Sequence, residues 1–508
     1  MASLFDESTF TDTDVIIKDG DDVIFKEESL AEVKPQPYLN TSEDSNGTGT
    51  KDQEYTVQEA VDAMGFGWFQ VKISFIVGFN WMADAFEIML LSVLSDKLRC
   101  EWDLYPYQQA LLTTFVFTGY FIGAPLWGMM GDKFGRKKTL ALCSFYIFYF
   151  GFLSSFSPNL IWLLILRGLL GASLGGTSQS VIICAEFLPS KSRGLCLVCL
   201  EAFWVIGVCL EITLAMVVMP TLGWRYLLIF SSFPLVIFMV LVTFLPESAS
   251  YQQASGNWSG AMATLEDISR TNKKPLPSGK LKRNAELKPK GSIRELFSTK
   301  LLAMTTVILI NLWFCNAFLY YGNVLLSAEL FSSGVTSCVS TSNNSTTEQE
   351  CFSACKSLDT QGYVGLLVSS LGEIPGILLT LFMIDTAGRK LTMGLEMLVC
   401  AVFSFLLLMC VDGIPQMIFI FVIRGMISGA FQALYVYTPE VFPTNVRSVG
   451  LGWCVAFSKL GSIVTPFVAQ VLIKQSVFMT FCVYGGCAVF ASLLAFILPT
   501  ETKGRTLK

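Results

Sequence analysis

Histidine is absent from this 508-residue sequence, and only 15% of its residues are charged. A soluble protein of this length carries about 25% charged residues, so a soluble globular protein is excluded. Several apolar runs are longer than the roughly 20 residues that a helix needs to cross a bilayer. The chain is therefore predicted to be an all-α polytopic membrane protein. Because it has no histidine, any proton relay within it must use carboxylates.

Motifs for catalysis are also missing. The glycine-rich stretch GLLGASLGG at 168–176 has neither the preceding strand nor the Lys and Ser/Thr of a P-loop. Its small residues are expected instead to let apolar helices pack closely. The sequence shows no nucleophile, metal cluster or nucleotide motif, so we predict no enzyme activity, no cofactor, no metal site and no nucleic-acid partner.

Residues 1–68 lack the apolar core of a secretory signal. They contain sixteen acidic side chains and four lysines, a net charge of −12 against −5 for the whole chain. Such a segment is predicted to be a disordered cytoplasmic tail. It can serve as an arm for cytoplasmic protein partners, and a solvated leader without partners is the alternative.

Hydropathy predicts twelve transmembrane helices in two groups of six. The first group, within 69–246, has spans at 71–95, 108–130, 139–157, 160–186, 195–219 and 225–246. The second group, within 299–498, has spans at 299–321, 361–383, 391–411, 415–438, 449–473 and 476–498. A polar linker, 247–298, separates the two groups, and residues 499–508 form a short C-terminal tail.

The distribution of Lys and Arg sets the predicted orientation. These residues are concentrated in the linker, in the C-terminal tail and in the loops on one side. The opposite side has only Lys97, Arg99, Arg225, Lys356 and Lys474. Because positive charge favours the cytoplasmic side, both termini and the linker are predicted to be cytoplasmic.

The loop at 322–360 is then predicted to be lumenal. It carries overlapping glycosylation sequons at Asn343 and Asn344 and three cysteines, and a fourth cysteine lies in another loop on the same side. Both N-glycosylation and disulfides require the lumenal or extracellular compartment. Four cysteines allow three pairings, and the sequence does not choose among them. The disulfide candidates are Cys100, Cys338, Cys351 and Cys355.

Four motifs recur in the second half at offsets of 253 to 257 residues. GDKFGRKK at 131 returns as IDTAGRK at 384, RGLLGA at 167 as RGMISGA at 424, AEFLPSKSR at 185 as PEVFPTNVR at 439, and LPES at 245 as LPTE at 498. Four recurrences at nearly one spacing indicate that the two halves are duplicates with the same orientation.

These motifs carry a family resemblance. Two six-span halves with G-D-x-x-G-R-K after the second span resemble the major facilitator superfamily over about residues 66–505. The patterns E-x-x-P-x-x-x-R after span four and P-x-E-x-x-G after span twelve are similar to its sugar and organic-ion porter branches. YTVQEAVDAMGFGWFQVK and WMADAFEIMLLSVL resemble the synaptic vesicle 2-related group more narrowly. The resemblance implies a fold of two pseudo-symmetric halves and a location in synaptic or secretory vesicles.

The repeated loops place charged side chains on the predicted cytoplasmic face, where charges of the two halves can pair. A carrier that alternates access needs a lock that can reopen. We therefore predict two gate networks. The alternative is that the charges are positive-inside anchors only, which explains Lys137 and Lys138 better than it explains repeated carboxylates. The predicted gate residues are Asp132, Arg136, Glu186 and Arg193, with Asp385, Arg389, Glu440 and Arg447.

Five charged residues lie deep in the predicted spans, where each costs roughly 2.5–3.5 kcal/mol on insertion scales. Asp84 and Glu87 share one face of span one. Counting ~1.5 Å per residue places Arg167 of span four level with them, and proton-coupled sugar porters resemble this arrangement. Movement of Arg167 could change the protonation of the carboxylates. Binding of a cationic substrate and a static ion pair are the alternatives. Glu201 and Glu211 of span five are secondary candidates.

The second half adds further candidates. Glu373 lies in SLGEIPG, which resembles span eight of organic-ion porters. Lys459 of span eleven is expected either to neutralise Glu373 or to attract an anionic substrate group. Asn316, Tyr320 and Tyr321 of span seven resemble the Y-Y-G element of organic-ion porters, with packing as the alternative for the tyrosines. The Q-Q-x-S-G element of hexose porters is missing, which argues against glucose-like substrates.

The sequence thus predicts a monomeric secondary active transporter that carries a small organic ion or solute, coupled to protons, across the bilayer of a vesicle. The rival hypothesis is a non-transporting scaffold or receptor that keeps the transporter fold. Charges near the midplane favour transport, because a scaffold has little reason to keep several costly ionisable groups.

Overall fold

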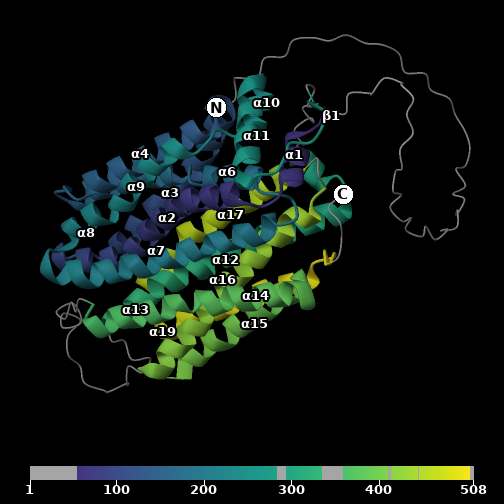
Figure 1. The fold of residues 1–508 in the computed structure, drawn as a ribbon. Helices are drawn as coiled ribbons and strands as arrows, with labels where there is room; N and C mark the ends of the chain where they lie inside the picture. Colours follow the sequence, from purple (N-terminus) through teal and green to yellow (C-terminus); the bar gives the residue numbers. More distant parts are fainter. Residues whose placement is uncertain (1–53, 283–292, 334–357, 410–412, 444–445, 504–508) are drawn as a thin grey trace, which may run out of the picture. The chain divides into compact units, whose positions relative to one another are not determined.

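The computed structural model describes residues 54–282, 293–333, 358–409, 413–443 and 446–503, and this part of the chain is almost entirely helical (Figure 1). Eleven helices in it are long and apolar enough to cross a membrane. They lie in the two halves that the repeat predicts.

The first half contains spans one to six. Its helices are α2 (Trp68–Glu101), α3 (Pro106–Phe134), α4 (Arg136–Ser154), α5 (Leu160–Leu174) with α6 (Ser178–Phe187), α7 (Arg193–Thr221), and α8 (Trp224–Ser231) with α9 (Phe233–Leu241) and η1 (Val242–Phe244). α4 stands in the place of the third predicted span but is not among the eleven. It has 19 residues and begins with three cations. It nevertheless packs against α3, α5 and α9.

The second half contains spans seven to twelve. Its helices are α12 (Lys300–Ser333), α13 (Thr360–Leu371) with α14 (Glu373–Thr386), α15 (Arg389–Leu406) with η3 (Leu407–Met409), α16 (Ile414–Val441), α17 (Arg447–Pro466) with the π-helix η4 (Phe467–Leu472) and α18 (Ile473–Gln475), and α19 (Val477–Ile497). The loop predicted at 322–360 begins later than expected, because the largely apolar residues 324–331 continue α12 to Ser333.

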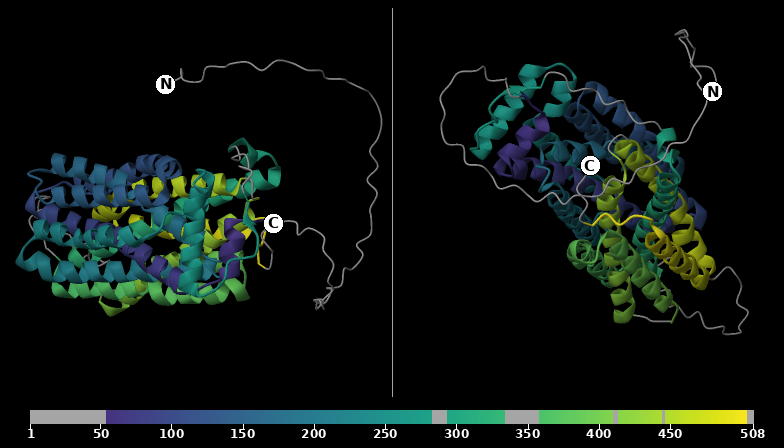
Figure 2. Two further views of the ribbon diagram at one scale, coloured as in Figure 1. Left: turned by 45° about the horizontal axis from the view of Figure 1, so that its top comes forward. Right: turned by 90° about the vertical axis from the view of Figure 1, so that its right-hand side faces the viewer.

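The start of the described chain and the linker are structured together. The elements are β1 (Glu54–Tyr55), α1 (Val57–Met64), α10 (Ala249–Ala254), α11 (Trp258–Asn272), β2 (Lys280–Leu281) and η2 (Ile293–Phe297). β1 pairs in parallel with β2, and α1 packs against α11. We call the end of the helical bundle where α1, α10 and α11 lie the linker end, on the right in Figure 1 and again beside the C-terminus in Figure 2.

This arrangement corrects one boundary. Residues 54–68 were predicted to belong to a disordered tail, yet α1 begins with a capping box between Thr56 and Glu59. A capping box satisfies two backbone N–H groups at the start of a helix. Val57, Val61 and Met64 of α1 are buried, so the helix has an apolar face to pack. The earlier part of the predicted tail, 1–53, lies outside the described residues.

The halves meet through helices that the repeat relates to each other. α17 packs against α3, and α13 packs against α7. α3 and α13 belong to spans two and eight, and α7 and α17 to spans five and eleven, so the two contacts are equivalent under the repeat. α12 also contacts α2. The interface between the halves is therefore pseudo-symmetric, as the duplication predicts.

Within each half, glycine allows two helices to approach closely. A Cβ on Gly123 of α3 would overlap the carbonyl oxygen of Ala172 in α5, and a Cβ on Gly376 of α14 would overlap that of Gly425 in α16. A Cβ on Gly171 would likewise overlap a backbone oxygen of α3. The packing interpretation of the stretch at 168–176 is confirmed.

We expect Gly123→Ala to lower the melting temperature of the purified protein, because overpacking a tight contact costs about 1–3 kcal/mol. Gly128 of the same helix is the matched control, since a Cβ there would meet no atom within 4 Å. Gly128→Ala should leave the melting temperature unchanged or raise it, because alanine favours helix. Thermal unfolding followed by size-exclusion chromatography measures both, and equal melting temperatures would contradict the close-packing argument.

Candidate transport site and gates

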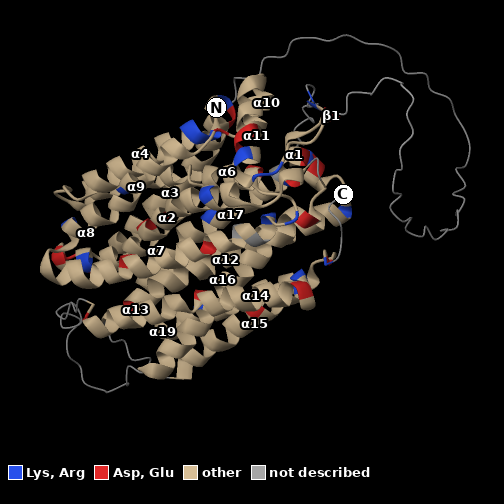
Figure 3. Ribbon diagram, viewed as in Figure 1, with Lys and Arg blue, Asp and Glu red and all other residues tan. Residues whose placement is uncertain are grey.

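Most charged residues lie towards the ends of the helices, and few interrupt the apolar middle of the bundle (Figure 3). Two ion pairs in the middle are almost completely buried. Arg167 Nη1 donates to Glu87 Oε2 at 2.7 Å, with side-chain exposures of 0% and 2%. Arg424 Nε donates to Glu373 Oε1 at 2.8 Å, and both side chains are 1% exposed. Each half therefore holds one buried arginine–glutamate pair.

Both arginines are only partly satisfied. Nε and Nη2 of Arg167, and Nη1 and Nη2 of Arg424, have no hydrogen-bond partner in the described part of the chain. A guanidinium offers five donors in a planar fork, so each side chain holds its present carboxylate with much of its capacity unused. Such an arginine can bind a second acceptor, or exchange one acceptor for another, without losing other hydrogen bonds.

The first pair matches the depth estimate that placed Arg167 level with Glu87. The second pair corrects an expectation: Lys459 does not neutralise Glu373, because Arg424 holds that carboxylate. Arg424 was missed by the sequence reasoning although a signal was present. It occupies the position of Arg167 in the repeated motif, RGMISGA against RGLLGA.

Tyr320 joins the second pair to the first half. Its hydroxyl donates to Glu373 Oε1 at 3.2 Å and accepts from Trp204 Nε1 at 2.6 Å. Tyr320 lies on α12 and Trp204 on α7, so this chain of hydrogen bonds crosses the interface between the halves. Tyr320 was predicted as a site residue, whereas Trp204 was not, because a tryptophan in a span gives no sign of its partner.

Asp84 and Lys459 belong to opposite halves, on α2 and α17. Thr177 Oγ1 donates to Asp84 Oδ2 at 3.3 Å, while Oδ1 has no hydrogen-bond partner in the described chain. Lys459 Nζ lies 3.8 Å from the ring centroid of Tyr120 and 5.8 Å from that of Tyr321. The charges of Asp84 and Lys459 are close enough to interact electrostatically. The two carboxylates of span one thus have different partners.

The other buried polar groups in the spans differ in how well they are satisfied. Asn316 is fully buried, and neither atom of its amide has a partner in the described chain. Glu211 accepts from Ser231 Oγ at 2.9 Å with each oxygen. Glu396, which the sequence reasoning missed, accepts from Thr380 Oγ1 at 2.5 Å. The two carboxylates therefore have partners within their own halves, whereas both amide atoms of Asn316 are unsatisfied among the described residues.

At the linker end, each half has its own charged network. Arg136 Nη1 lies 2.8 Å from Asp132 and its Nε lies 3.8 Å from Glu186. In the second half, Arg389 donates to both oxygens of Glu440 at 3.0 and 3.1 Å. Six of the eight predicted gate residues are brought together in these two clusters, the sixth being Asp385, 4.0 Å from Arg389.

These ion pairs of Arg136 and Arg389 at the linker end lie within one half each. The lock across the interface stays a prediction. Arg193 donates to Gln58 Oε1 at 2.6 Å and to the Leu188 carbonyl, and Arg447 donates to the Phe442 carbonyl at 3.4 Å. The Leu188 and Phe442 carbonyls lie in the loops that precede α7 and α17, so each arginine bonds to the loop before its own helix.

Two carboxylates that the prediction omitted complete these clusters. Glu247 accepts from the backbone N–H groups of Arg136 and Lys137 at 2.9 and 3.1 Å, and Glu501 accepts from those of Arg389 and Lys390 at 3.0 and 3.1 Å. They satisfy the free N–H groups at the starts of α4 and α15, where negative charge is favoured. The repeated LPES and LPTE motifs, which contain these glutamates, could have indicated them in the sequence.

Glu501 makes the folding stability of the protein depend on pH. Its partial burial would raise the pKa, but backbone donors including Lys390, Arg389, Lys503 and Thr502 outweigh this and lower the pKa below its ordinary value. A lowered folded-state pKa adds stability that is complete above the ordinary glutamate pKa of about 4.3 and is lost as pH falls through the folded-state value.

We therefore expect Glu501→Gln to lower the melting temperature near neutral pH, and the difference from the unmodified protein to shrink as pH falls below about 4. Glu54→Gln is the control, since Glu54 is exposed and its side chain has no bond to any described residue. Melting curves recorded across this pH range test the expectation. A difference that stays constant with pH would contradict it.

The end of the bundle opposite the linker end is closed by a polar cluster between the halves. Gln109 Nε2 of α3 donates to Glu329 Oε1 at 2.6 Å and to Asp96 Oδ1 at 2.8 Å, and Gln109 Oε1 accepts from Lys474 Nζ at 2.6 Å. Lys474 and Glu329 also form an ion pair at 3.1 Å. Gln109 therefore holds an acid–lysine pair of the second half against the first half. A second bond runs from Gln470 Nε2 to Ser95 Oγ at 2.9 Å.

We expect Gln109→Leu to release the halves at this end, because it removes hydrogen bonds to both members of the acid–lysine pair. Gln108→Leu is the matched control, since that amide oxygen accepts from the backbone of Tyr105 in its own half. Spin labels on exposed Tyr107 and Met479, in a background without free cysteines, report the separation. Unchanged distance distributions in Gln109→Leu would show that the cluster does not close this end.

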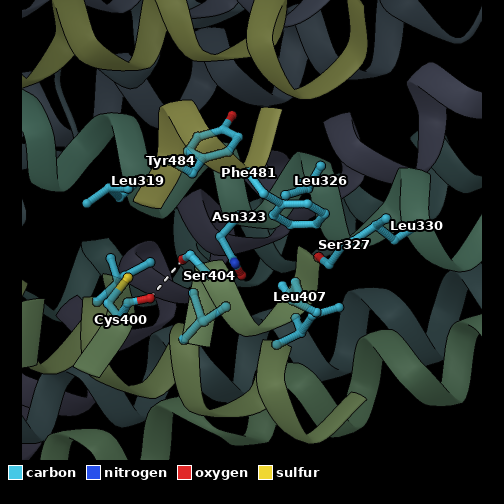
Figure 4. A pocket seen from close by; sticks show the side chains of 13 residues that line it. Leu319, Asn323, Leu326, Ser327, Leu330, Cys400, Ser404, Leu407, Phe481 and Tyr484 are labelled. Atoms are coloured by element: carbon cyan, nitrogen blue, oxygen red, sulfur yellow. Dashed lines mark hydrogen bonds between the residues drawn. The ribbon is translucent and has the colours of Figure 1, made fainter. Parts of the chain in front are cut away.

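The central charges do not line the two clearest cavities. One cavity of about 380 Å³ lies in the second half at the linker end, beside Glu440, Leu302 and Thr502. The other, of about 10 Å³, lies inside the second half beside Asn323 and Tyr484 (Figure 4). Its volume is near the minimum for one water molecule. Neither is lined by a charge of the predicted coupling site.

The lumenal modifications lie mostly outside the described residues. Cys338, Cys351, Cys355, Asn343 and Asn344 all belong to segments that the structure does not describe. Cys100 is disulfide-bonded, while the other ten cysteines in the described part are free. The glycosylation sites and the disulfide pairing stay predictions.

Comparison with known proteins gives consistent results. The profile of the family described as "Sugar (and other) transporter" matches residues 68–508. Synaptic vesicle 2-related protein of Xenopus laevis is 44% identical, and the match covers 97% of this chain and 90% of the relative. The protein of the same name from Rattus norvegicus is 46% identical, and the match covers 90% of this chain and 83% of the relative. The partially occluded inward-open structure of the xylose transporter XylE from E. coli has a TM-score of 0.66 at 17% identity, covering 87% of this chain and 100% of its own. That structural likeness establishes the fold alone.

Proposed function

Because this chain belongs to the sugar (and other) transporter family of the major facilitator superfamily, we propose that it is a proton-coupled secondary carrier of a small organic ion. It works by alternating access in a vesicle membrane. The family is one of transporters and not of enzymes. The vesicle location rests on the names of the relatives, which are synaptic vesicle 2-related proteins.

The observation that carries the proposal is the buried pair of Glu87 and Arg167, with two donors of Arg167 unused. A buried ion pair adds little stability, because the desolvation penalty can exceed the attraction. The pair is therefore poorly explained as a structural brace. An arginine that leaves Glu87 for another acceptor would expose the carboxylate to a proton, and its return would expel that proton. This exchange couples a proton gradient to movement of the halves.

The rest of the structure fits one state of the transport cycle. The polar cluster around Gln109 closes the end opposite the linker, and the ion pairs of Arg136 with Glu186 and of Arg389 with Glu440 at the linker end lie within one half each. With the predicted orientation, the linker end is cytoplasmic. The two networks would then be part of the cytoplasmic gate, each stiffening the half that moves.

The scaffold or receptor alternative is not favoured. A scaffold does not need two buried arginine–glutamate pairs, one in each half, with unused donors on both arginines. Nor does it need bonds that cross the interface at Tyr320 and Gln109. The proposal treats these contacts as elements that change partners during transport.

Uptake into proteoliposomes under an imposed pH gradient, screened with labelled organic cations, anions, zwitterions and neutral solutes, tests the proposal. We expect accumulation of one solute class, and we expect Glu87→Gln to abolish its dependence on the gradient by removing the titratable group. Glu396→Gln is the matched control, a buried glutamate bonded within its own half, and should retain gradient-driven uptake. Equal gradient dependence in Glu87→Gln would rule out this coupling site. No uptake of any class by well-folded protein would favour a scaffold.

A further inference from the structure

Lys459 is the buried cation of the spans that lacks a carboxylate in contact. It is 9% exposed, and in the described part of the chain its ammonium group has neither an ion pair nor a hydrogen bond. Its contacts are the faces of Tyr120 and Tyr321. A cation over an aromatic ring is stabilised by only about 0.5–2 kcal/mol, less than a charged hydrogen bond of about 1.5–3 kcal/mol. The ammonium group is thus free to accept an anionic partner.

Asp84 is the complementary group. It is 4% exposed, its Oδ2 has a single long hydrogen bond from Thr177, and its Oδ1 has none in the described chain. A buried carboxylate can accept several hydrogen bonds, so most of its capacity is unused. No ion pair joins Asp84 to Lys459 in the described chain. Asp84 is free to accept a cationic partner.

The two groups belong to different halves, Asp84 to α2 and Lys459 to α17. The neighbouring arginines are already matched, Arg167 with Glu87 and Arg424 with Glu373. Asp84 and Lys459 are therefore an anion and a cation of opposite halves without a direct ion pair, while Glu201 of α7 interacts with the neutral side chains of Gln432 and Trp81. Resting on the transport proposed above, we infer that Asp84 and Lys459 select a zwitterionic substrate, whose cationic group binds Asp84 and whose anionic group binds Lys459.

Charge balance separates this inference from the alternatives. A substrate with one positive charge would bind Asp84 but leave Lys459 buried without its counter-charge, and an anion would do the same to Asp84. An uncompensated buried charge costs several kcal/mol. A zwitterion satisfies both groups and keeps the site neutral. A neutral sugar would meet only hydrogen-bonding needs and would leave the two charges as they are.

The same geometry connects binding to movement. A zwitterion held by Asp84 and Lys459 would join α2 to α17 across the interface, close to the polar bond between Trp204 and Tyr320. Binding energy from both ends of the substrate would then favour a conformation in which the halves enclose it. A substrate with one charged end could not join the halves in this way.

The probes are ω-amino acids from glycine to 6-aminohexanoate, n-alkylamines and n-alkyl carboxylates of the same lengths, and D-xylose as a neutral solute. Both uptake into proteoliposomes and thermal stabilisation of the purified protein are measured. The wild type should prefer one or more zwitterions to the matched single ions by at least about tenfold. Lys459→Gln should shift the preference to alkylamines, and Asp84→Asn should shift it to alkyl carboxylates. Lys459→Arg should keep the zwitterion preference. The double variant that exchanges the charges, Asp84→Lys with Lys459→Asp, should keep it as well. Size-exclusion chromatography checks folding.

The outcomes distinguish this inference from the proposed function. Uptake of single ions or D-xylose by the wild type, without a preference for zwitterions, overturns the inference and supports transport. Stabilisation by zwitterions with the expected switches, but no uptake of any solute, supports the inference and overturns transport. Absence of both uptake and stabilisation by every zwitterion overturns the inference. Unchanged selectivity in folded Lys459→Gln and Asp84→Asn overturns it as well.

Discussion

The cost of placing a charge in an apolar span governs this structure. A buried charge is stabilised by an opposite charge or a hydrogen bond, and the partners of Glu87 and Glu373 lie on other helices. Glu87 binds Arg167 of another span, and Glu373 binds Arg424 in the same way. The charges thereby decide which helices meet at the centre of each half. The glycine contacts between α3 and α5, and between α14 and α16, decide how closely they meet.

The two halves share one fold but place different charged residues at their interface. The arginines occupy equivalent positions of the repeat, yet Glu87 comes from span one and Glu373 from span eight. The first half contributes an open carboxylate at Asp84, and the second contributes an open ammonium group at Lys459. A duplicated scaffold thus places an open acidic group in one half and an open basic group in the other. Such asymmetry allows a symmetric movement to act on a substrate with distinct ends.

The sequence predicted most of the fold, because hydropathy and a repeat with a constant offset depend only on residue type and order. The pairing of Arg167 with Glu87 was also predictable, since both depths could be counted along their helices. The partner of Glu373 was not, because Arg424 was read as part of a motif and not as a charge. Gln109 left no signal, since an uncharged amide in a span does not stand out from its neighbours. Contacts such as these depend on how helices rotate against each other, which sequence order does not specify.

The caps made by Glu247 and Glu501 have a mechanical consequence. Each glutamate follows the last helix of its half and binds the start of the third, at α4 and α15. The segment after the sixth span of each half is thereby connected to the start of the third span, so the two move together. A half built in this way moves as one rigid body along the length of its spans. Its rigidity depends partly on one carboxylate at the linker end.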